Sequence, residues 1–432
     1  MLYYLGIFCL FFVFSYICFK KPLIGLSLIL LTLPLYQIRF FLFVPLTFLE
    51  IEILILFFIF LLKKIYKKEK IFLPPKILLT LIILFLLSAS VAVFISPDFL
   101  KSLGFWKAFF VEPVIVFFLV INLVHSKKDL FFLVKSLCLG AFVASLWAIF
   151  QKIFSVGGVW SREFWAGPEI WRATGPFPHP NFLGLYIGPL LLITFSLFFK
   201  VKNKQEKIFW LSAFLIGIVS LFLARSEGAI LAVFFSCFLF SLFFSKKTKI
   251  IALILLFLCL FVFVLDIQNF RSSFLTKLKF EDISGQLRLN IWKGAWKMLK
   301  DSPVFGVGLR GYQILAPSYQ EKYSQIINGQ ELISVETHPY PHNLFLSLYL
   351  ELGILGFLIF LALVSLFFAQ SWNFFEKTKD VFALGLIFAM LVVLIHGLVD
   401  TPYFKNDLSI IFWTIFSFSL SFIQAYEKEG AK

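Results

Sequence analysis

Runs of about twenty apolar residues recur along nearly the whole length of this 432-residue chain. A helix of that length is what crosses the ~30 Å hydrocarbon core of a bilayer. Backbone polar groups in lipid must be bonded within the segment, so these runs should be helices and not open sheets. A hydrophobic share of 60% and a charged share of 15% agree with this class. The sequence therefore predicts an all-α, polytopic integral membrane protein.

The apolar runs give about 12 or 13 predicted membrane spans. They lie at about 2–19, 22–36, 40–62, 76–95, 106–124, 129–150, 181–199, 208–224, 228–245, 250–265, 343–369, 381–398 and 408–425. The run at 22–36 is the doubtful one, because it is short and contains Pro34. The first run has no basic start and no small-residue cleavage site, so we expect a membrane helix there and not a removed signal peptide.

A polar stretch at 266–342 is the one long break in this pattern. It divides the chain into spans at 1–265, a large loop at 266–342, and further spans with a short tail at 343–432. Lysines crowd every second loop between the spans, and by the positive-inside rule those loops are cytoplasmic. This placement accounts for the net charge of +15 without a nucleic-acid partner. The large loop then faces outward and is expected to contain short amphipathic helices.

The unusual polar motifs all lie in the loops predicted to face outward, at 96–105, 151–180, 224–228, 266–342 and 398–407. Four of the five histidines are in or beside them: His179, His338, His342 and His396. His396 lies four residues before Asp400, a spacing that allows a hydrogen-bonded pair on one helix face. This segregation indicates a single active face that looks away from the cytoplasm.

The loop at 151–180 ends in a proline-rich turn that carries Arg172 and His179. Three prolines and a glycine within six residues predict a rigid, non-helical turn just above the membrane. We expect Arg172 and His179 to lie where an anionic lipid head group binds, and Asn181 to cap the following helix. A purely structural turn is the alternative.

Arg225 lies between two apolar runs that are separated by almost no loop, which places its charge at the membrane interface. A charge so close to hydrocarbon is costly unless it is paired or functional. An ion pair with Glu227 would make Arg225 structural. Alternatively, its guanidinium binds a diphosphate, whose oxygens it can contact two at a time.

Residues 285–301 have the periodicity of an amphipathic helix. One face holds Arg288, Trp292, Ala295 and Leu299, and the other holds Lys293, Lys297 and Lys300. A single arginine thus shares the apolar face with a tryptophan, either to snorkel at the membrane surface or to face a substrate. Pro303, Gly306 and Gly308 then end the helix and permit close approach of the backbone.

Two prolines place His342 and Asn343 at the start of the next apolar run. Since Pro339 and Pro341 favour extended backbone, a helix should begin here, at the membrane interface. A helix N-terminus favours anions and keeps a nearby histidine neutral, so His342 is the candidate general base. An inert interfacial histidine is the alternative.

Together these motifs resemble the O-antigen ligase/polymerase family of bacterial membrane glycosyltransferases, in order and over most of the chain. The resembling segments are Arg172-x-Thr-Gly with Pro178-His-Pro-Asn181, Ala-Arg225-Ser-Glu-Gly, Gly285-x-x-Arg288-x-x-x-Trp292, Pro303-x-x-Gly306-x-Gly308, His342-Asn343-x-x-Leu346 and Glu351-Leu-Gly353. Glu227 departs from the family pattern, which has glycine directly after arginine or serine.

The resemblance implies transfer of a glycan from a polyprenyl (undecaprenyl) diphosphate carrier to an acceptor hydroxyl, on a lipid-linked core sugar or another cell-surface acceptor. It implies a site among membrane lipids on the outer side of the plasma (inner) membrane, with no cofactor. No Asp-x-Asp motif lies in the outward loops, so we expect no metal. For this chemistry the expected catalytic residues are His342, Arg288 and Arg225. The expected substrate-binding residues are Arg172, His179, Asn181, Trp292, His338 and Asn343.

Two alternatives are kept beside this reading. A polymerase of the same family would join carrier-linked repeat units instead of ligating a finished chain. A transporter or lipid flippase would need internal repeats and polar groups near mid-membrane. The sequence shows no repeat, and Glu52 and Glu112 lie near the ends of their spans, so a transferase is favoured.

Overall fold

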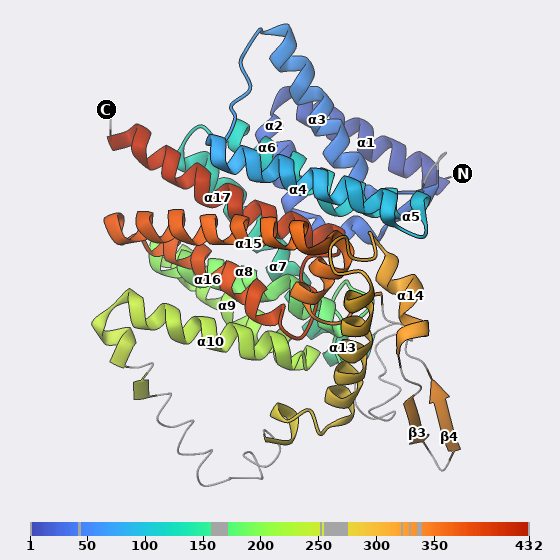
Figure 1. Ribbon diagram of the computed structural model, residues 1–432. Coiled ribbons are helices and arrows are strands. Elements are labelled where there is room, and N and C mark those ends of the chain that lie inside the picture. Colours follow the sequence, from blue (N-terminus) through green and yellow to red (C-terminus); the bar gives the residue numbers. More distant parts are fainter. Residues whose placement is uncertain are drawn as a thin grey trace.

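The computed structural model describes residues 2–41, 45–156, 172–250, 253–254, 275–320, 323–327, 330–334 and 339–430. It is 81% helical with almost no strand, which confirms the all-α prediction. Within these residues, eight helices are long and apolar enough to cross a membrane. The long helices lie alongside one another in one bundle (Figure 1), as expected of a polytopic membrane protein. The larger count of about 12 spans stays a prediction.

The N-terminal elements are helix α1 (Leu2–Lys20), helix α2 (Pro22–Leu31), the 3₁₀ helix η1 (Leu33–Gln37), strands β1 (Arg39–Phe41) and β2 (Pro45–Thr47), and helices α3 (Phe48–Tyr66) and α4 (Lys76–Ile95). The doubtful run at 22–36 is interrupted because Pro34 lies in the 3₁₀ turn. The run at 40–62 starts as an antiparallel pair of strands and becomes helical only at α3. That helix begins where Thr47 and Glu50 form a capping box.

The middle of the chain is a series of long helices. Helices α5 (Phe99–Trp106) and α6 (Glu112–Leu123) are joined by a π-helical turn, η2 (Lys107–Val111), into one span. The following helices are α7 (Lys127–Phe154), α8 (Pro180–Lys200), α9 (Lys204–Ala224) and α10 (Glu227–Phe244). Helices α9 and α10 are separated by two residues, so Arg225 does lie at the junction of two apolar helices. The predicted run at 250–265 lies largely outside the described residues.

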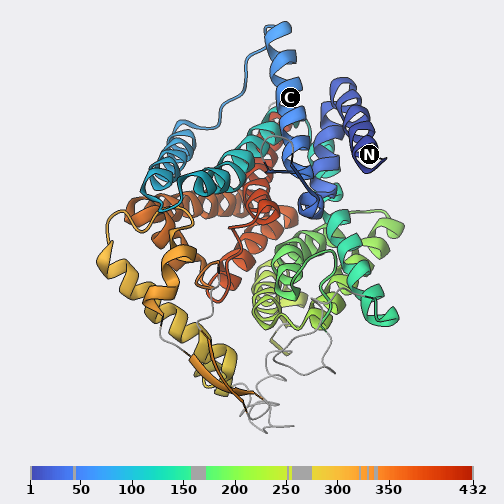
Figure 2. The same ribbon diagram turned by 90° about the vertical axis from the view of Figure 1, so that its right-hand side faces the viewer.

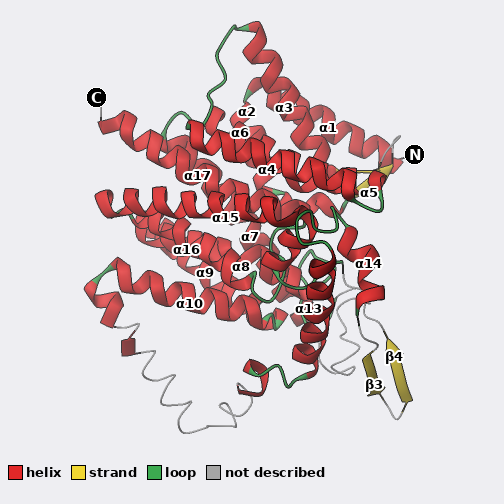
Figure 3. Ribbon diagram, viewed as in Figure 1, coloured by secondary structure: helices red, strands yellow, loops and turns green. Residues whose placement is uncertain are grey.

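The large loop contains helix α13 (Ile283–Asp301), helix α14 (Gly311–Tyr319) and an antiparallel pair of strands, β3 (Tyr323–Ile327) and β4 (Gln330–Ser334). The strands lie beyond one end of the helical bundle (Figure 3). Helix α13 crosses the long helices and does not run along them (Figures 1 and 2). Its predicted amphipathic character is confirmed, because Ala295 and Leu299 lie in one buried cluster with Tyr312 of α14. The sequence does not predict the strand pair.

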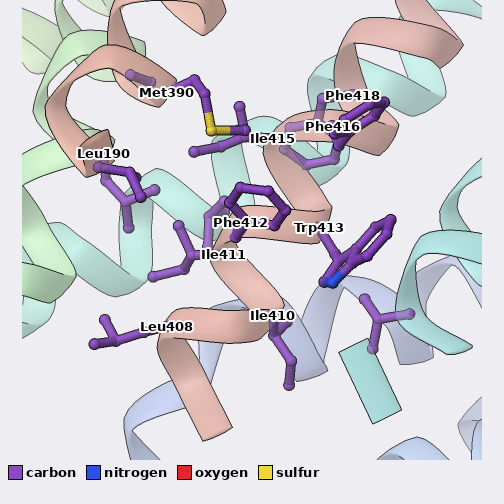
Figure 4. Close-up of a cluster of buried hydrophobic side chains, with 14 of the residues drawn as sticks. Leu190, Met390, Leu408, Ile410, Ile411, Phe412, Trp413, Ile415, Phe416 and Phe418 are labelled. Atoms are coloured by element: carbon purple, nitrogen blue, oxygen red, sulfur yellow. The ribbon is translucent and has the colours of Figure 1, made fainter. Parts of the chain in front are cut away.

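The C-terminal helices are α15 (Leu344–Thr378), α16 (Val381–His396) and α17 (Asn406–Gly430). Helix α17 contacts α6, α7, α8, α15 and α16. Figure 4 shows its Phe412 and Trp413 in the hydrophobic core, together with Leu190 of α8 and Met390 of α16. A helix that is apolar on most sides is stable only when it is surrounded. Helix α17 is therefore the central helix of this part of the bundle.

Helix α15 is broken at Gly353, where the backbone has φ of +70° and ψ of −179°. Glycine adopts this conformation readily, whereas a residue with a side chain would be strained. The turn that follows α13 bonds to the backbone on both sides of the break. The Val307 N–H donates to the Leu350 carbonyl at 2.7 Å, and the Ile354 N–H donates to the Val304 carbonyl at 3.0 Å.

The same turn, residues 303–309, also reaches α4. The Leu309 N–H donates to the Ala92 carbonyl at 3.0 Å. A Cβ atom at Gly306 would overlap the backbone of α15, and one at Gly308 would overlap the backbone of α4. The close approach predicted for both glycines is therefore confirmed. The turn fastens the large loop to two membrane helices.

Candidate functional site

His342 and Asp400 form a polar pair at the start of α15. The Nδ1 atom of His342 lies 3.3 Å from Oδ1 of Asp400, which belongs to the loop at 397–405 between α16 and α17. The same carboxylate oxygen accepts a hydrogen bond from the Thr401 N–H at 2.8 Å. The side chains of His342 and Asp400 are 27% and 9% exposed. A substrate can therefore reach the imidazole, while the carboxylate behind it is enclosed.

The electrostatics of this pair favour a charged carboxylate. Burial opposes ionisation of Asp400. The hydrogen bond with His342, the charges of His342 and His396, and the Thr401 N–H outweigh it, and the pKa of Asp400 lies well below its usual range. Because a carboxylate only accepts hydrogen bonds, the proton on this side of the ring belongs to Nδ1. The lone pair of His342 is then on Nε2, which suits a general base.

The sequence pairs Asp400 with the wrong histidine. Asp400 bonds to His342, whereas Nδ1 of His396 is buried and has no hydrogen-bond partner among the described residues. The His396 ring instead packs against Gly228, where a Cβ atom would lie 3.0 Å from its Cδ2. The four-residue spacing of His396 and Asp400 is a local pattern, whereas His342, the histidine that does contact Asp400, is 58 residues away from it in the sequence. Only the prediction that both loops lie on the same side of the membrane could have suggested it.

Helix α13 holds the segment that carries His342. The indole Nε1 of Trp292 donates to the Pro341 carbonyl at 2.8 Å, and its ring meets Phe280 edge to face at 5.4 Å. Trp292 thus positions the residue directly before His342. Contact of Trp292 with substrate stays a prediction.

Arg288 lies one turn before Trp292, on the same side of α13, and is half-buried. Its Nη1 donates to the Ser284 hydroxyl at 2.9 Å. Its Nε atom is buried and has no hydrogen-bond partner within the part of the chain that is described. An unsatisfied guanidinium N–H is expensive in such a place, and an anionic ligand would satisfy it. Arg288 is also close enough to His396 for their charges to interact.

Hydrogen bonds of the Arg172 guanidinium join it to Asn181 and to the turn that holds Arg225. The Arg172 guanidinium donates to the Ala224 carbonyl at 2.7 Å, to the Asn181 side-chain oxygen at 2.7 Å and to the Arg225 carbonyl at 3.2 Å. Arg172 therefore ties the 172–181 segment to the turn between α9 and α10. These bonds support the structural alternative for Arg172, and its contact with substrate stays a prediction.

Arg225 is exposed at the end of α9, in the left-handed conformation with φ of +48°. The alternative partner predicted for it, Glu227, hydrogen-bonds to Lys277. Arg225 thus presents its guanidinium to the surface at the junction of two membrane helices. This placement favours the ligand-binding alternative.

Helix α8 is capped by His179 and not by Asn181. Nδ1 of His179 accepts a hydrogen bond from the Asn181 N–H at 3.2 Å. Pro180 occupies the first helical position, which suits its fixed φ, so the cap falls one residue before the proline. The cap predicted at Asn181 is wrong by two residues. The predicted start of α15 agrees better with the structure. Asn343 caps that helix, because its side-chain oxygen accepts a hydrogen bond from the Leu346 N–H at 2.9 Å.

Asn343 also fastens α15 to the loop of Asp400. Its Nδ2 donates to the Leu398 carbonyl at 2.9 Å, and the Leu344 N–H donates to the Gly397 carbonyl at 2.7 Å. These bonds hold the two halves of the His342–Asp400 pair together. Substrate binding by Asn343 stays a prediction. His338, also predicted to bind substrate, lies outside the described residues.

The described residues contain no group of three or more His, Cys, Asp or Glu side chains that could hold a metal ion. Metal independence nevertheless stays a prediction, which activity measurements must test. The predicted site residues and Asp400 supply an imidazole, a carboxylate and guanidinium groups. Together they can accept a proton from a hydroxyl and neutralise a leaving anion.

Residues 211–361 match the protein-family model described as O-antigen ligase. The matched segment contains Arg225, Arg288 and His342, whereas the 172–181 segment and Asp400 lie outside it. No curated protein matches the chain.

Proposed function

We propose that this protein is a membrane glycosyltransferase of ligase or polymerase type, because residues 211–361 match the O-antigen ligase family model, and we propose a donor, an acceptor and a side for its reaction. The donor is a glycan on a polyprenyl diphosphate, and the acceptor is a hydroxyl of a lipid-linked core sugar or another cell-surface glycan. The reaction takes place on the outer side of the plasma membrane. The single observation that carries the proposal is the His342–Asp400 pair, which the buried, unsatisfied Nε–H of Arg288 complements as a donor for an anion.

In this reaction Nε2 of His342 takes the proton of the acceptor hydroxyl. The hydroxyl oxygen forms a bond to the anomeric carbon of the donor sugar as the bond between that carbon and the diphosphate oxygen breaks. Asp400 holds the ring in the required tautomer and stabilises the imidazolium that forms. The proton can later leave with the diphosphate or pass to water, so the enzyme returns to its starting state.

The leaving group is a lipid diphosphate, whose charge grows as the glycosidic bond breaks. Arg288 supplies a guanidinium with an unsatisfied N–H, and Arg225 supplies one at the interface. Fixed donors aimed at developing charge lower the barrier most where water is excluded. We assign the diphosphate to these two arginines, and the choice between ligase and polymerase to the acceptor.

A deletion strain separates the two members of this family. Loss of a ligase should leave full-length glycan chains on the polyprenyl carrier, whereas loss of a polymerase should leave single repeat units. Lipid-linked glycans extracted from the strain and resolved by size show which species accumulates. An unchanged pool of lipid-linked glycans would contradict the proposal.

The proposed side of the membrane gives a labelling prediction. Lys202 and Lys300 are exposed lysines at loops predicted to lie on opposite sides. In intact spheroplasts, a cysteine from Lys300→Cys should react with an impermeant maleimide, and one from Lys202→Cys should react only after lysis. The parent protein without substitutions is the control for its own cysteines. Labelling at 202 but not at 300 would overturn the orientation.

The absence of a metal requirement gives a second prediction. Transfer by the purified protein should be unchanged by EDTA, because the proposed chemistry uses only an imidazole base and guanidinium groups. Transfer is measured before and after dialysis against the chelator, and again after Mg²⁺ or Mn²⁺ is added. Inactivation that a divalent ion reverses would contradict the proposal.

A further inference from the structure

The loop at 397–405 holds two charged side chains with different surroundings. Asp400 faces His342, as described above, and Lys405 lies at the other end of the loop, directly before α17. Between them, Tyr403 and Phe404 are buried, and the Trp413 indole donates to the Tyr403 hydroxyl at 3.1 Å. The loop is thus anchored in the bundle between its two charges. Whatever holds Lys405 therefore also restricts Asp400.

Three aromatic rings enclose the Lys405 ammonium group. Nζ lies 3.5 Å from the ring centre of Phe182, and 5.2 Å from those of Phe177 and Tyr36. The rings come from three separate elements: η1, the segment before α8, and α8 itself. Cation–π attraction is strongest for a desolvated cation, and the Lys405 side chain is only 14% exposed.

Lys405 is also the counter-ion of a buried acid. Nζ lies 3.9 Å from Oδ1 of Asp407, whose side chain is 0% exposed. Neither Nζ nor the Asp407 oxygens have a hydrogen-bond partner in the described chain, nor does the hydroxyl of Tyr186 nearby. Cation–π contacts and the ion pair with Asp407, and not hydrogen bonds, therefore hold the Lys405 side chain. A buried acid that lost this partner would be left uncompensated.

From this geometry we infer that Lys405 is a positioning residue, which holds the 397–405 loop against Tyr36, Phe177 and Phe182 and so fixes Asp400 at His342. Its effect on catalysis rests on the function proposed above. The positive charge is the active property of the side chain, because an apolar chain of equal length would fill the cage without pairing with Asp407. Phe177 also belongs to the 172–181 segment that Arg172 ties to Arg225, so one lysine links the two halves of the site.

Acid–base behaviour supports this inference. Burial lowers the pKa of Lys405 from 10.5 to about 8, although the charges of Asp407 and Asp400 oppose the shift. The other charged and titratable groups of this cluster are the hydroxyls of Tyr36 and Tyr186, on which the Asp407 charge acts, and Arg39, whose charge acts on Tyr36. The folded protein therefore loses the Lys405 charge as the pH rises through about 8, while an unfolded chain keeps it up to about 10.5.

The test compares Lys405→Met, which keeps length and removes charge, with Lys405→Arg, which cannot lose its charge at these pH values. Lys405→Met should lower kcat roughly 10²-fold, since a small displacement of a catalytic group has such effects. KM for the lipid-linked donor should not change, because the Lys405 ammonium group is enclosed by aromatic rings and Asp407. Lys405→Arg should recover most of kcat. Lys379→Met is the matched control, because Lys379 also lies over a ring, that of Phe375, and pairs with an acid far from the site.

The pH dependence separates positioning from a merely structural role. Wild-type kcat should fall above about pH 8, and Lys405→Arg should lack this fall. The free energy of unfolding should change in the opposite direction from kcat. Between pH 8 and 10.5 the unfolded state binds more protons at Lys405, so its contribution to the unfolding free energy rises with pH. Lys405→Met should lack this rise.

Two results would overturn the inference: wild-type kcat in Lys405→Met, or the same pH dependence of unfolding in wild type and Lys405→Met. If Lys405→Met fails to fold, equal alkaline loss of kcat in wild type and Lys405→Arg overturns it instead. Absence of transfer by the wild-type protein contradicts the proposed function. The unfolding measurement needs no substrate, so it still decides the state of Lys405.

Discussion

Replacing His342 by alanine should reduce glycan transfer by roughly 10²–10⁴-fold, the usual contribution of a positioned general base. The reason is the 3.3 Å contact with Asp400, which leaves Nε2 as the nitrogen that accepts a proton. The protein should remain folded, because the helix cap of α15 belongs to Asn343 and not to His342. Transfer is measured with purified enzyme, lipid-linked donor and acceptor, at equal amounts of folded protein.

Two further variants make this test specific. Asp400→Asn keeps the shape of the side chain and removes its charge, so it should also lose most of kcat, because an amide that donates to Nδ1 leaves the ring proton on Nε2, the wrong tautomer for a base. His125→Ala, an exposed histidine next to the first turn of α7, should have no effect. Normal turnover in His342→Ala would place the base elsewhere, with His179 the next candidate.

The pH dependence of the wild-type enzyme follows from the same pair. The pKa of Asp400 is held well below its usual range, so the carboxylate stays ionised throughout mildly acidic conditions. Loss of activity as the pH falls should therefore not result from protonation of Asp400.

Replacing Arg288 by lysine should lower transfer roughly 10²-fold while leaving the protein inserted and folded. Lysine keeps the charge but lacks the planar fork that contacts two phosphate oxygens at once. It also lacks the Nε–H that is buried without a partner in the described structure. The anchor of α13 to the His342 segment should survive, because Trp292 provides it.

Lys293→Ala is the matched control for Arg288→Lys, since Lys293 lies on the exposed face of the same helix. It should transfer glycan normally. Binding of the lipid diphosphate, measured separately from turnover, should weaken in Arg288→Lys and not in Lys293→Ala. Near-normal activity in Arg288→Lys would reduce the arginine to a cation that snorkels at the membrane surface.

Hydropathy predicts the helices well because burial in lipid is a property of each segment by itself. Helices α4, α8 and α9 begin and end within a few residues of the predicted runs. The prediction fails where local backbone chemistry decides, as at Pro34, which interrupts one run, and at Thr47, which starts a helix late. The break at Gly353 depends on a turn elsewhere in the chain, so the apolar run at 343–369 gives no sign of it.

The site was predicted in part for a similar reason. Arg288 stands out in the sequence because it shares the apolar face of an amphipathic helix, and His342 because two prolines place it at the start of an apolar run. Their partners do not stand out in the sequence. The contacts of Trp292 with Pro341 and of His342 with Asp400 join segments that are far apart along the chain. The bond of Arg172 to the backbone at Ala224 is equally long in range. Sequence patterns therefore suggest candidate site residues, while only the fold shows which contacts orient them.

The turn at 303–309 has a consequence for the biogenesis of the protein. Its backbone bonds reach α4, near the start of the chain, and both sides of the break in α15, which is synthesised after the turn itself. The loop cannot dock until α15 has been inserted beside α4, so a nascent chain that ends within the loop has no assembled site. We therefore expect partly inserted chains to be unable to ligate or polymerise glycans, because insertion of the later helices is needed to complete the proposed site.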